Sequence, residues 1–408
     1  MVTRWLGPAI VGMLLSCRGP RVGDSLETGG AGSGEVAGGG GAASGGGGHA
    51  AGGDAGTETT GGVPETGGGG ATVECEGLAC EPTVLYPGPA DVAGSSAICD
   101  GRGSTFDGTD VYVACPMSTL ATSVLLAEMV VVRVETATGG HRRLSAADEF
   151  LLGLLIERAL VAVDDTHAYW FSRLADDDEH LYLRRSPKGQ TQPESLVAMV
   201  AGDDGTAPAA IAVDDTHVYW SSAGHGLFRA PKTGADAAEL VRAYPTVGVA
   251  VAVADGQLFW SSLDDGHLTR RDLTTGDETV VSSGPTVGYV DMCDIALGGA
   301  DLFFAQCDPP YELHRIPWGA AADQDQVVTS TVDDVRLAND YLGSVAVDDA
   351  AVYFLGAEWV HRAPRTGGAS VRLSHNSTGA HVAAHLVGVD ARRVYWVTTD
   401  GGVLATAK

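Results

Sequence analysis

Residues 211–222 read Ile-Ala-Val-Asp-Asp-Thr-His-Val-Tyr-Trp-Ser-Ser, and this short pattern predicts the architecture of most of the chain. Two apolar runs flank the segment from Asp214 to His217. Aspartate favours a turn there because its side chain accepts hydrogen bonds from nearby backbone N–H groups. Together with the residues that follow, the stretch predicts four antiparallel strands, at residues 211–213, 218–222, 226–231 and 239–241.

The aromatic pair in this stretch recurs along the chain at intervals of 40 to 57 residues. Seven segments share an apolar residue followed by an aromatic and, in all but the first, a second aromatic: Val111-Tyr112-Val113, Ala168-Tyr169-Trp170, Val218-Tyr219-Trp220, Leu258-Phe259-Trp260, Leu302-Phe303-Phe304, Val352-Tyr353-Phe354 and Val394-Tyr395-Trp396. Strand signals dominate each interval and helix signals are nearly absent. A repeat of this length built from short strands is typical of a β-propeller, in which each repeat forms one blade.

The segments Val218-Tyr219-Trp220-Ser221-Ser222 and Val394-Tyr395-Trp396-Val397-Thr398 resemble the repeats of YWTD-type and TolB-like propellers. The resemblance covers roughly residues 83–408. It implies an all-β fold, which we expect to be a propeller of seven four-stranded blades. Six blades are the alternative, because YWTD domains are generally six-bladed. The resemblance leaves function open, since such folds serve as receptors, scaffolds and enzymes.

The last repeat provides only three strands before the chain ends at Lys408. A propeller avoids an exposed sheet edge when one terminus supplies the missing strand of the final blade. The apolar segment from Thr83 to Tyr86 precedes the first repeat. We therefore expect these four residues to close the ring.

The N-terminal residues 1–16 have the pattern of a targeting segment, with Arg4 followed by a short apolar run. Leu14-Leu15-Ser16-Cys17 resembles the lipobox of bacterial lipoprotein precursors. The resemblance implies cleavage before Cys17, a lipid on Cys17, and attachment to the outer membrane, facing the periplasm or the cell surface. Residues 17–72 are glycine-rich and predict a disordered tether, and residues 73–82 form a short cysteine-containing segment.

The chain carries a formal charge of −27. Such acidity would repel phosphates, so we expect no nucleic acid partner and no contact with an anionic membrane surface except through the lipid anchor. A well-solvated acidic body is also expected to be a monomer.

Six cysteines remain after Cys17 is set aside, and an even number suits an oxidising compartment. They fall into neighbours along the chain. Since antiparallel strands bring such neighbours within disulfide range, we predict the pairs Cys99–Cys115, Cys293–Cys307 and Cys75–Cys80.

Acidic and histidine clusters offer weaker indications of a site. The pairs Asp164-Asp165, Asp214-Asp215 and Asp348-Asp349 occupy the same turn of different repeats, so one calcium ion could not collect them, and we expect turn formation instead. The loop from Asp176 to Glu179 is denser, and a cation is the alternative there. His375, His381 and His385 lie close in sequence, but their spacing fits no established metal site, which favours exposed loop histidines.

The mouth of the central funnel is the better candidate. When the innermost strands are aligned on one another, a set of polar residues falls at equivalent positions before or within them: Asp100, Arg102, Glu157, Arg158, Asp291, Asp294, Asp340, Tyr341 and His385. Such a set could bind a polar ligand or a metal. The structural alternative is that the two arginines pair with the acids around a solvated channel.

The sequence therefore favours a non-catalytic binding or scaffolding lipoprotein, whose partner is a protein or a small polar ligand and which needs no cofactor. The alternative is a funnel-metal propeller enzyme of the lactonase or lyase kind, in which Glu157, Asp291 and His385 would hold a divalent cation. No catalytic motif such as Gly-x-Ser-x-Gly is present in the sequence.

Overall fold

The computed structural model describes seventeen stretches of the chain. They are residues 81–89, 95–97, 99, 103–119, 126–152, 159–200, 208–222, 225–234, 237–243, 250–262, 267–282, 292–306, 312–319, 324–330, 344–356, 358–379 and 381–408. The predicted signal segment, the tether and the cysteine pair at residues 75 and 80 lie outside them. Within these stretches, no helix is long and apolar enough to cross a membrane.

Repeats three to six are separate four-stranded antiparallel sheets, each in simple chain order. Their strands are β12 (Pro208–Val213), β13 (His217–Ser222), β14 (Gly226–Pro231) and β15 (Glu239–Arg242); β16 (Val251–Ala254), β17 (Gln257–Ser261), β18 (Leu268–Asp272) and β19 (Glu278–Ser282); β20 (Met292–Gly298), β21 (Asp301–Gln306), β22 (Glu312–Pro317) and β23 (Gln326–Ser330); β24 (Val345–Val347), β25 (Ala351–Leu355), β26 (Trp359–Pro364) and β27 (Val371–His375). The all-β, propeller-type fold predicted from the sequence is thereby confirmed.

Repeats one and two have the same four strands but are joined into one larger sheet. They consist of β3 (Thr105–Phe106), β4 (Asp110–Thr119), β5 (Leu126–Glu135) and β6 (His141–Arg143), and of β8 (Val161–Val163), β9 (His167–Leu174), β10 (Asp177–Pro187) and β11 (Glu194–Val200), with β2 (Ser95–Ala97) and β7 (Glu149–Leu152) in addition. The hairpin of β4 and β5 is long enough to pair beyond β3 and β6. There β2 pairs with β4, and β7 pairs with both β5 and β9.

A buried carboxylate holds this junction together. Glu149, in β7, is 1% exposed, and its Oε2 atom accepts hydrogen bonds from Trp170 Nε1 at 2.5 Å and from Ser172 Oγ at 2.6 Å. Its Oε1 atom accepts from the backbone N–H of Ala146 at 2.9 Å. A buried carboxylate needs such partners, because leaving it without them would cost several kcal/mol.

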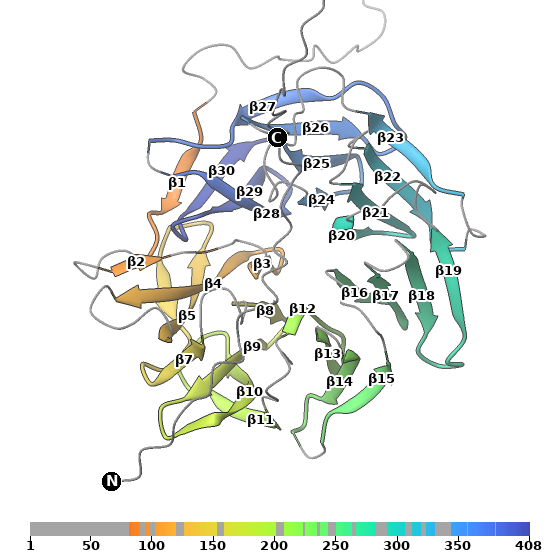
Figure 1. The fold of residues 1–408 in the computed structure, drawn as a ribbon. Coiled ribbons are helices and arrows are strands. Elements are labelled where there is room, and N and C mark those ends of the chain that lie inside the picture. The colour runs from red at the N-terminus through yellow and green to blue at the C-terminus, as the bar shows by residue number, and fades with distance from the viewer. Residues whose placement is uncertain are drawn as a thin grey trace, which may run out of the picture. The chain divides into compact units, whose positions relative to one another are not determined.

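Repeat seven contains strands from both ends of the described chain. It consists of β28 (Ala383–Val389), β29 (Arg393–Thr398), β30 (Val403–Ala407) and β1 (Thr83–Tyr86), in the order β1-β30-β29-β28. Thr83 pairs with Ala405 and Val84 with Leu404 in antiparallel register. Figure 1 shows β1, near the start of the colour scale, beside the blue C-terminal strands.

The first strands of the repeats surround a common centre (Figure 1). In the described part of the chain each of them contacts its two neighbours, in the circular order β3, β8, β12, β16, β20, β24, β28 and back to β3. We call these seven strands the inner strands.

The aromatic pairs pack between adjacent repeats. Successive residues of a strand face opposite sides of the sheet, so the two aromatics of each pair bury both faces at once. Tyr169 and Phe171 of repeat two pack in one cluster with Trp220 of repeat three, while Tyr219 faces the other way, toward Trp260 of repeat four. This alternation explains why the pair recurs in each repeat.

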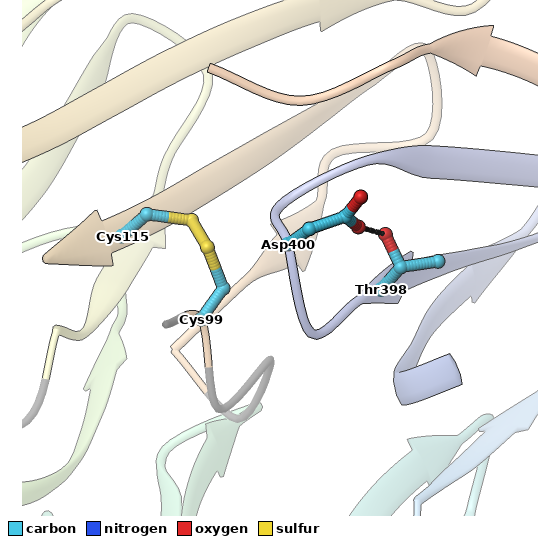
Figure 2. Close-up of a disulfide and its surroundings, with 4 residues drawn as sticks. All are labelled: Cys99, Cys115, Thr398 and Asp400. Atoms are coloured by element: carbon cyan, nitrogen blue, oxygen red, sulfur yellow. Dashed lines mark hydrogen bonds between the residues drawn. A yellow bond between two sulfur atoms is a disulfide. The ribbon is translucent and has the colours of Figure 1, made fainter. Parts of the chain in front are cut away.

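A disulfide joins the residue Cys99, which follows β2, to Cys115 in β4. Cys99 and Cys115 are bonded as predicted, with their Cα atoms 4.8 Å apart, and both are buried. They pack against the β29–β30 turn, where Gly401 has φ +81° and a Cβ would lie 2.8 Å from either sulfur. Figure 2 shows the disulfide beside Thr398 and Asp400 of that turn. Cys307 lies outside the described residues, so the pair Cys293–Cys307 stays a prediction, as does Cys75–Cys80.

Candidate functional site

The inner strands enclose a channel with a volume of about 550 Å³, to which all seven contribute side chains. This volume lies in the range of small-molecule sites. The walls supplied by repeats two, three and four consist entirely of alanine, valine, leucine and isoleucine. Aliphatic side chains of this size fit where seven strands converge on one centre.

Two of the residues predicted from the sequence meet in this channel. Asp294 lies in β20 and His385 in β28, and His385 Nε2 is 4.0 Å from Asp294 Oδ2. The same Oδ2 atom accepts a hydrogen bond from the backbone N–H of Val345 at 2.9 Å, and Oδ1 accepts one from Ile295 at 2.9 Å. Asp294 therefore bridges repeats five and six and places a negative charge beside an imidazole of repeat seven.

Two buried serines each directly precede an inner strand. Ser344, 2% exposed, accepts a hydrogen bond from the backbone N–H of Leu386 at 2.7 Å and so ties repeat six to repeat seven. Ser104, in repeat one, lines the channel and is 7% exposed, and none of the described residues forms a hydrogen bond with its hydroxyl. The sequence analysis missed Ser104 because a lone serine before a strand carries no distinctive signal.

The other predicted funnel residues are not placed. They lie outside the described residues: Asp100, Arg102, Glu157, Arg158, Asp291, Asp340 and Tyr341. The trio of Glu157, Asp291 and His385 proposed for a metal enzyme therefore stays a prediction.

The three clustered histidines do not converge. His375 stacks on Trp359 with ring centroids 3.8 Å apart, and His381 Nδ1 lies 2.7 Å from Asp400 Oδ2. His385 alone of the three lines the channel. Among the described residues no three histidine, cysteine or acidic side chains are grouped to hold a metal ion.

The turn aspartates have a second partner that the sequence analysis did not identify. The aspartate that begins each of these turns accepts hydrogen bonds from the backbone two and three residues later, as expected, and also from the tyrosine hydroxyl five residues later. This arrangement occurs at Asp107–Tyr112, Asp164–Tyr169, Asp214–Tyr219, Asp348–Tyr353 and Asp390–Tyr395, at 2.7–3.0 Å. A signal was present in the sequence: where Ala254 and Gly298 replace the aspartate, Phe259 and Phe303 replace the tyrosine.

These bonds shift the ionisation of both partners. Burial alone would raise the pKa of Asp164, but the Lys232 ammonium, the Tyr169 hydroxyl and two backbone N–H groups together hold that pKa well below its usual range. Burial, followed by the bond to the aspartate, raises the pKa of Tyr169 far above its usual value. The pair therefore stays as carboxylate and neutral phenol across the physiological range, which suits a structural role.

The dense acidic loop follows the same pattern. Asp177 lies at the β9–β10 turn, where its carboxylate contacts His180 Nδ1 at 2.8 Å and accepts the Tyr182 hydroxyl. The hydrogen bond from Tyr182, followed by that from His180, lowers the pKa of Asp177.

One residue after each third strand reaches back to the preceding repeat, and we call these the latch residues. In strand register they are equivalent, and they occupy positions Thr136, Lys188, Lys232, Leu273, Trp318, Arg365 and Lys408. Lys188 Nζ lies 2.6 Å from Asp107 Oδ2, and Lys232 Nζ lies 2.6 Å from Asp164 Oδ2. Lys408, the last residue, pairs with Asp348.

The side chain of a latch residue suits the group that it contacts in the preceding repeat. Arg365 pairs with Asp301 at 2.9 Å and lies over the Phe303 ring. Where repeat four offers Phe259 and no turn aspartate, the latch residue is Trp318, whose ring centroid lies 5.7 Å from that of Phe259. Leu273 packs in the cluster that contains Tyr219. Thr136 of repeat one is the exception, because its hydroxyl donates to the backbone carbonyl of Thr109 in its own repeat.

No protein-family model and no curated protein matches this chain. Among solved structures, it is similar to U3-55K, with a TM-score of 0.53, 10% identity, and coverage of 80% of this chain and 98% of that one. It is also similar to the computationally designed Ika8 protein, with a TM-score of 0.50, 10% identity, and coverage of 80% and 100%. BamB from Moraxella catarrhalis follows at a TM-score of 0.46, 13% identity, and coverage of 76% and 84%. At these identities the first two likenesses concern the fold alone.

Proposed function

We propose that this protein is a non-catalytic binding or scaffolding propeller. The observation that carries the proposal is the single channel of about 550 Å³ to which the inner strand of every repeat contributes. A largely preformed apolar cavity with a few convergent polar groups is what small-molecule sites have in common. The channel geometry supports binding. Of the polar groups placed in it, Asp294 accepts backbone hydrogen bonds from repeats five and six, whereas the Ser104 hydroxyl has no hydrogen-bond partner among the described residues.

The proposal includes a ring of seven blades closed by β1. Three observations support this count. The inner strand β3 contacts both β8 and β28, so repeat one lies within the circle rather than outside it. Strand β1 pairs with β30. The latch residues of repeats two to seven each reach the repeat before them.

The proposal also includes a lipid anchor at Cys17 and a location outside the cytoplasm. The lipobox-like Leu14-Leu15-Ser16-Cys17 supports the anchor. The Cys99–Cys115 bond supports an oxidising compartment. Replacement of Cys17 by alanine is expected to move the protein from the membrane fraction to the soluble fraction, and a variant that stays with the membranes would overturn the anchor.

Native mass spectrometry of the protein isolated from its own envelope tests the binding function. We expect a stoichiometric complex with a protein or a small molecule, and we expect the bound species to leave the protein chemically unchanged. A bound compound that is converted with time, or a stoichiometric divalent metal that is lost in Glu157→Ala, would instead identify an enzyme. Protein that carries no bound species under any isolation condition would overturn the binding function.

A further inference from the structure

The channel has two chemically different sides. Its polar lining comes from repeats five, seven and one, through Asp294, His385, Ser104 and Thr105. Repeats two, three and four follow one another around the ring, and their described lining residues are all apolar. A molecule lying in this channel would therefore meet hydrogen-bonding groups on one side and hydrocarbon on the other.

Ser104 points to a ligand independently of the cavity. The residue is 7% exposed, and its hydroxyl has no hydrogen-bond partner among the described residues. A buried hydroxyl without a hydrogen bond carries an energetic cost. That cost is recovered if a bound molecule supplies a hydroxyl or an amine to this atom.

The charge at the channel selects the kind of head group. Asp294 has backbone N–H donors on both oxygens, which is the environment of a carboxylate. The described lining contains no lysine or arginine. The chain as a whole carries −27. An anionic head group would be repelled, whereas a neutral or cationic one would be accepted.

We infer that the channel binds a small molecule with an apolar body and one neutral or cationic hydrogen-bonding head group. The head group lies toward Ser104, Asp294 and His385, and the body lies against repeats two to four. This inference rests on the proposed binding function and gives the class of its ligand.

Three compounds that share one alkyl chain test the inference by titration calorimetry with the full chain. Decanol and decylamine are expected to bind in one-to-one stoichiometry, and decanoate at least about tenfold more weakly, because its carboxylate faces that of Asp294. Equal affinity for all three, or tighter binding of decanoate, would overturn the assignment of the head group. Absence of binding by decanol and decylamine would overturn the inference itself.

Substitutions in the channel wall test whether the molecule binds there. Ala210→Phe places a ring in the apolar wall and is expected to abolish decanol binding. The control is Leu240→Phe, which is expected to leave decanol binding unchanged. Leu240 lies on the outer strand of the same repeat and is 49% exposed. Ser104→Ala removes only the unpartnered oxygen and is expected to weaken decanol roughly threefold to tenfold without disturbing the fold. Unchanged affinity in both Ala210→Phe and Ser104→Ala would place the ligand elsewhere.

Failure of this inference is distinguishable from failure of the proposed function. If the envelope-isolated protein holds a partner that Ala210→Phe also retains, the binding function stands and the channel is not its site. If the isolated protein holds nothing and the alkyl compounds do not bind, both proposals fail.

Discussion

Single side chains in the turns explain why tyrosine and aspartate occur together. The Asp214 carboxylate accepts the backbone N–H groups of Thr216 and His217 at 2.7 Å, and the hydroxyl of Tyr219 at 2.8 Å. Tyr219 is 1% exposed, so its hydroxyl depends on this acceptor. Repeat four shows the alternative solution, in which Ala254 and Phe259 remove both groups together.

A double-mutant cycle at this pair tests the dependence. Asp214→Ala is expected to lower the free energy of unfolding by about 2 kcal/mol, because it leaves a buried hydroxyl and two N–H groups without a partner. Tyr219→Phe is expected to cost about 1 kcal/mol. The double variant should cost less than the sum by about 1 kcal/mol, as measured by urea unfolding. Asp215→Ala, at the exposed second aspartate, is the matched control and should change stability by less than about 0.5 kcal/mol. Strict additivity would contradict the pairing.

A buried histidine makes stability depend on pH. His361 is 4% exposed and stacks on Phe354 with ring centroids 5.1 Å apart. Desolvation by burial lowers its pKa from 6.5 to about 4. Because the folded pKa lies below the unfolded one, the contribution of His361 is complete above about pH 6.5 and is lost as the pH falls toward 4.

We expect His361→Leu to flatten this part of the stability profile. The wild-type protein should lose up to about 3 kcal/mol from this group between pH 6.5 and pH 4, and the variant should not. Chemical denaturation at a series of pH values measures the difference. His375→Leu, at the partly exposed histidine stacked on Trp359, is the control. Parallel profiles for the wild type and His361→Leu would show that the group does not titrate as stated.

The latch residues of repeats two to seven connect each of these repeats to the one before it. Lys232 pairs with Asp164 of the preceding repeat, and both side chains are less than one fifth exposed, at 18% and 13%. Trp318 occupies the equivalent position in repeat five, where the preceding repeat offers Phe259. Each of these interfaces between repeats thus carries its own matched contact.

Replacing a latch residue by one of a different chemical type is therefore expected to lower the free energy of unfolding. Lys232→Met should destabilise by about 1–3 kcal/mol, because it leaves a partly buried carboxylate without its cation. It should also make the protein more sensitive to acid, since the pKa of Asp164 would rise and its protonation would begin at higher pH. Trp318→Lys should destabilise by about 2 kcal/mol, because it places an ammonium on Phe259. Thermal unfolding at pH 7 and pH 4 measures both effects.

The control for these exchanges is an exposed ion pair. Arg229→Met removes a contact with Glu239, whose side chain is 60% exposed, and should change stability by less than about 1 kcal/mol. An equal loss in Arg229→Met and Lys232→Met would show that the latch position is not special.

The sequence predicted the elements well because their signals are local. The strands of repeat three begin and end within a few residues of the predicted bounds, since alternating apolar residues and turn aspartates act over short distances. The latch contacts were missed for the opposite reason. Lys188 and Asp107 are 81 residues apart, and each on its own reads as a solvated surface charge.

The candidate site was predicted in part. Asp294 and His385 were found by aligning the inner strands, because equivalent positions in a ring of repeats face one centre. The joining strand β7 was not found, because its pairing depends on the length of the β4–β5 hairpin rather than on its own sequence. The apolar lining from repeats two to four could not be predicted, because in the sequence these residues look the same as residues of the hydrophobic core.

In the proposed ring, β1 and β30, the first and last strands of the described chain, close the molecule by pairing with each other. Deleting residues 83–86 removes the backbone hydrogen bonds of β1 and the burial of Tyr86, and is expected to cost about 4 kcal/mol and to promote aggregation through the exposed edge of β30. Thermal unfolding and light scattering measure these changes. Deleting residues 28–60 should change neither. A protein that starts at residue 90 and melts like the full chain would contradict closure by β1.

The place of β1 also has a mechanical consequence. It is the first strand of the described chain, and it lies at the edge of its sheet with β30 as its partner. Tension applied from the N-terminal side would therefore load the β1–β30 ladder before any other part of the ring. Once β1 and then β2, which pairs with β4, had separated from their partners, extension would stop at Cys99, because its covalent bond to Cys115 ties the chain to repeat one. The protein would yield by a short, fixed length under load while its remaining sheets stayed folded.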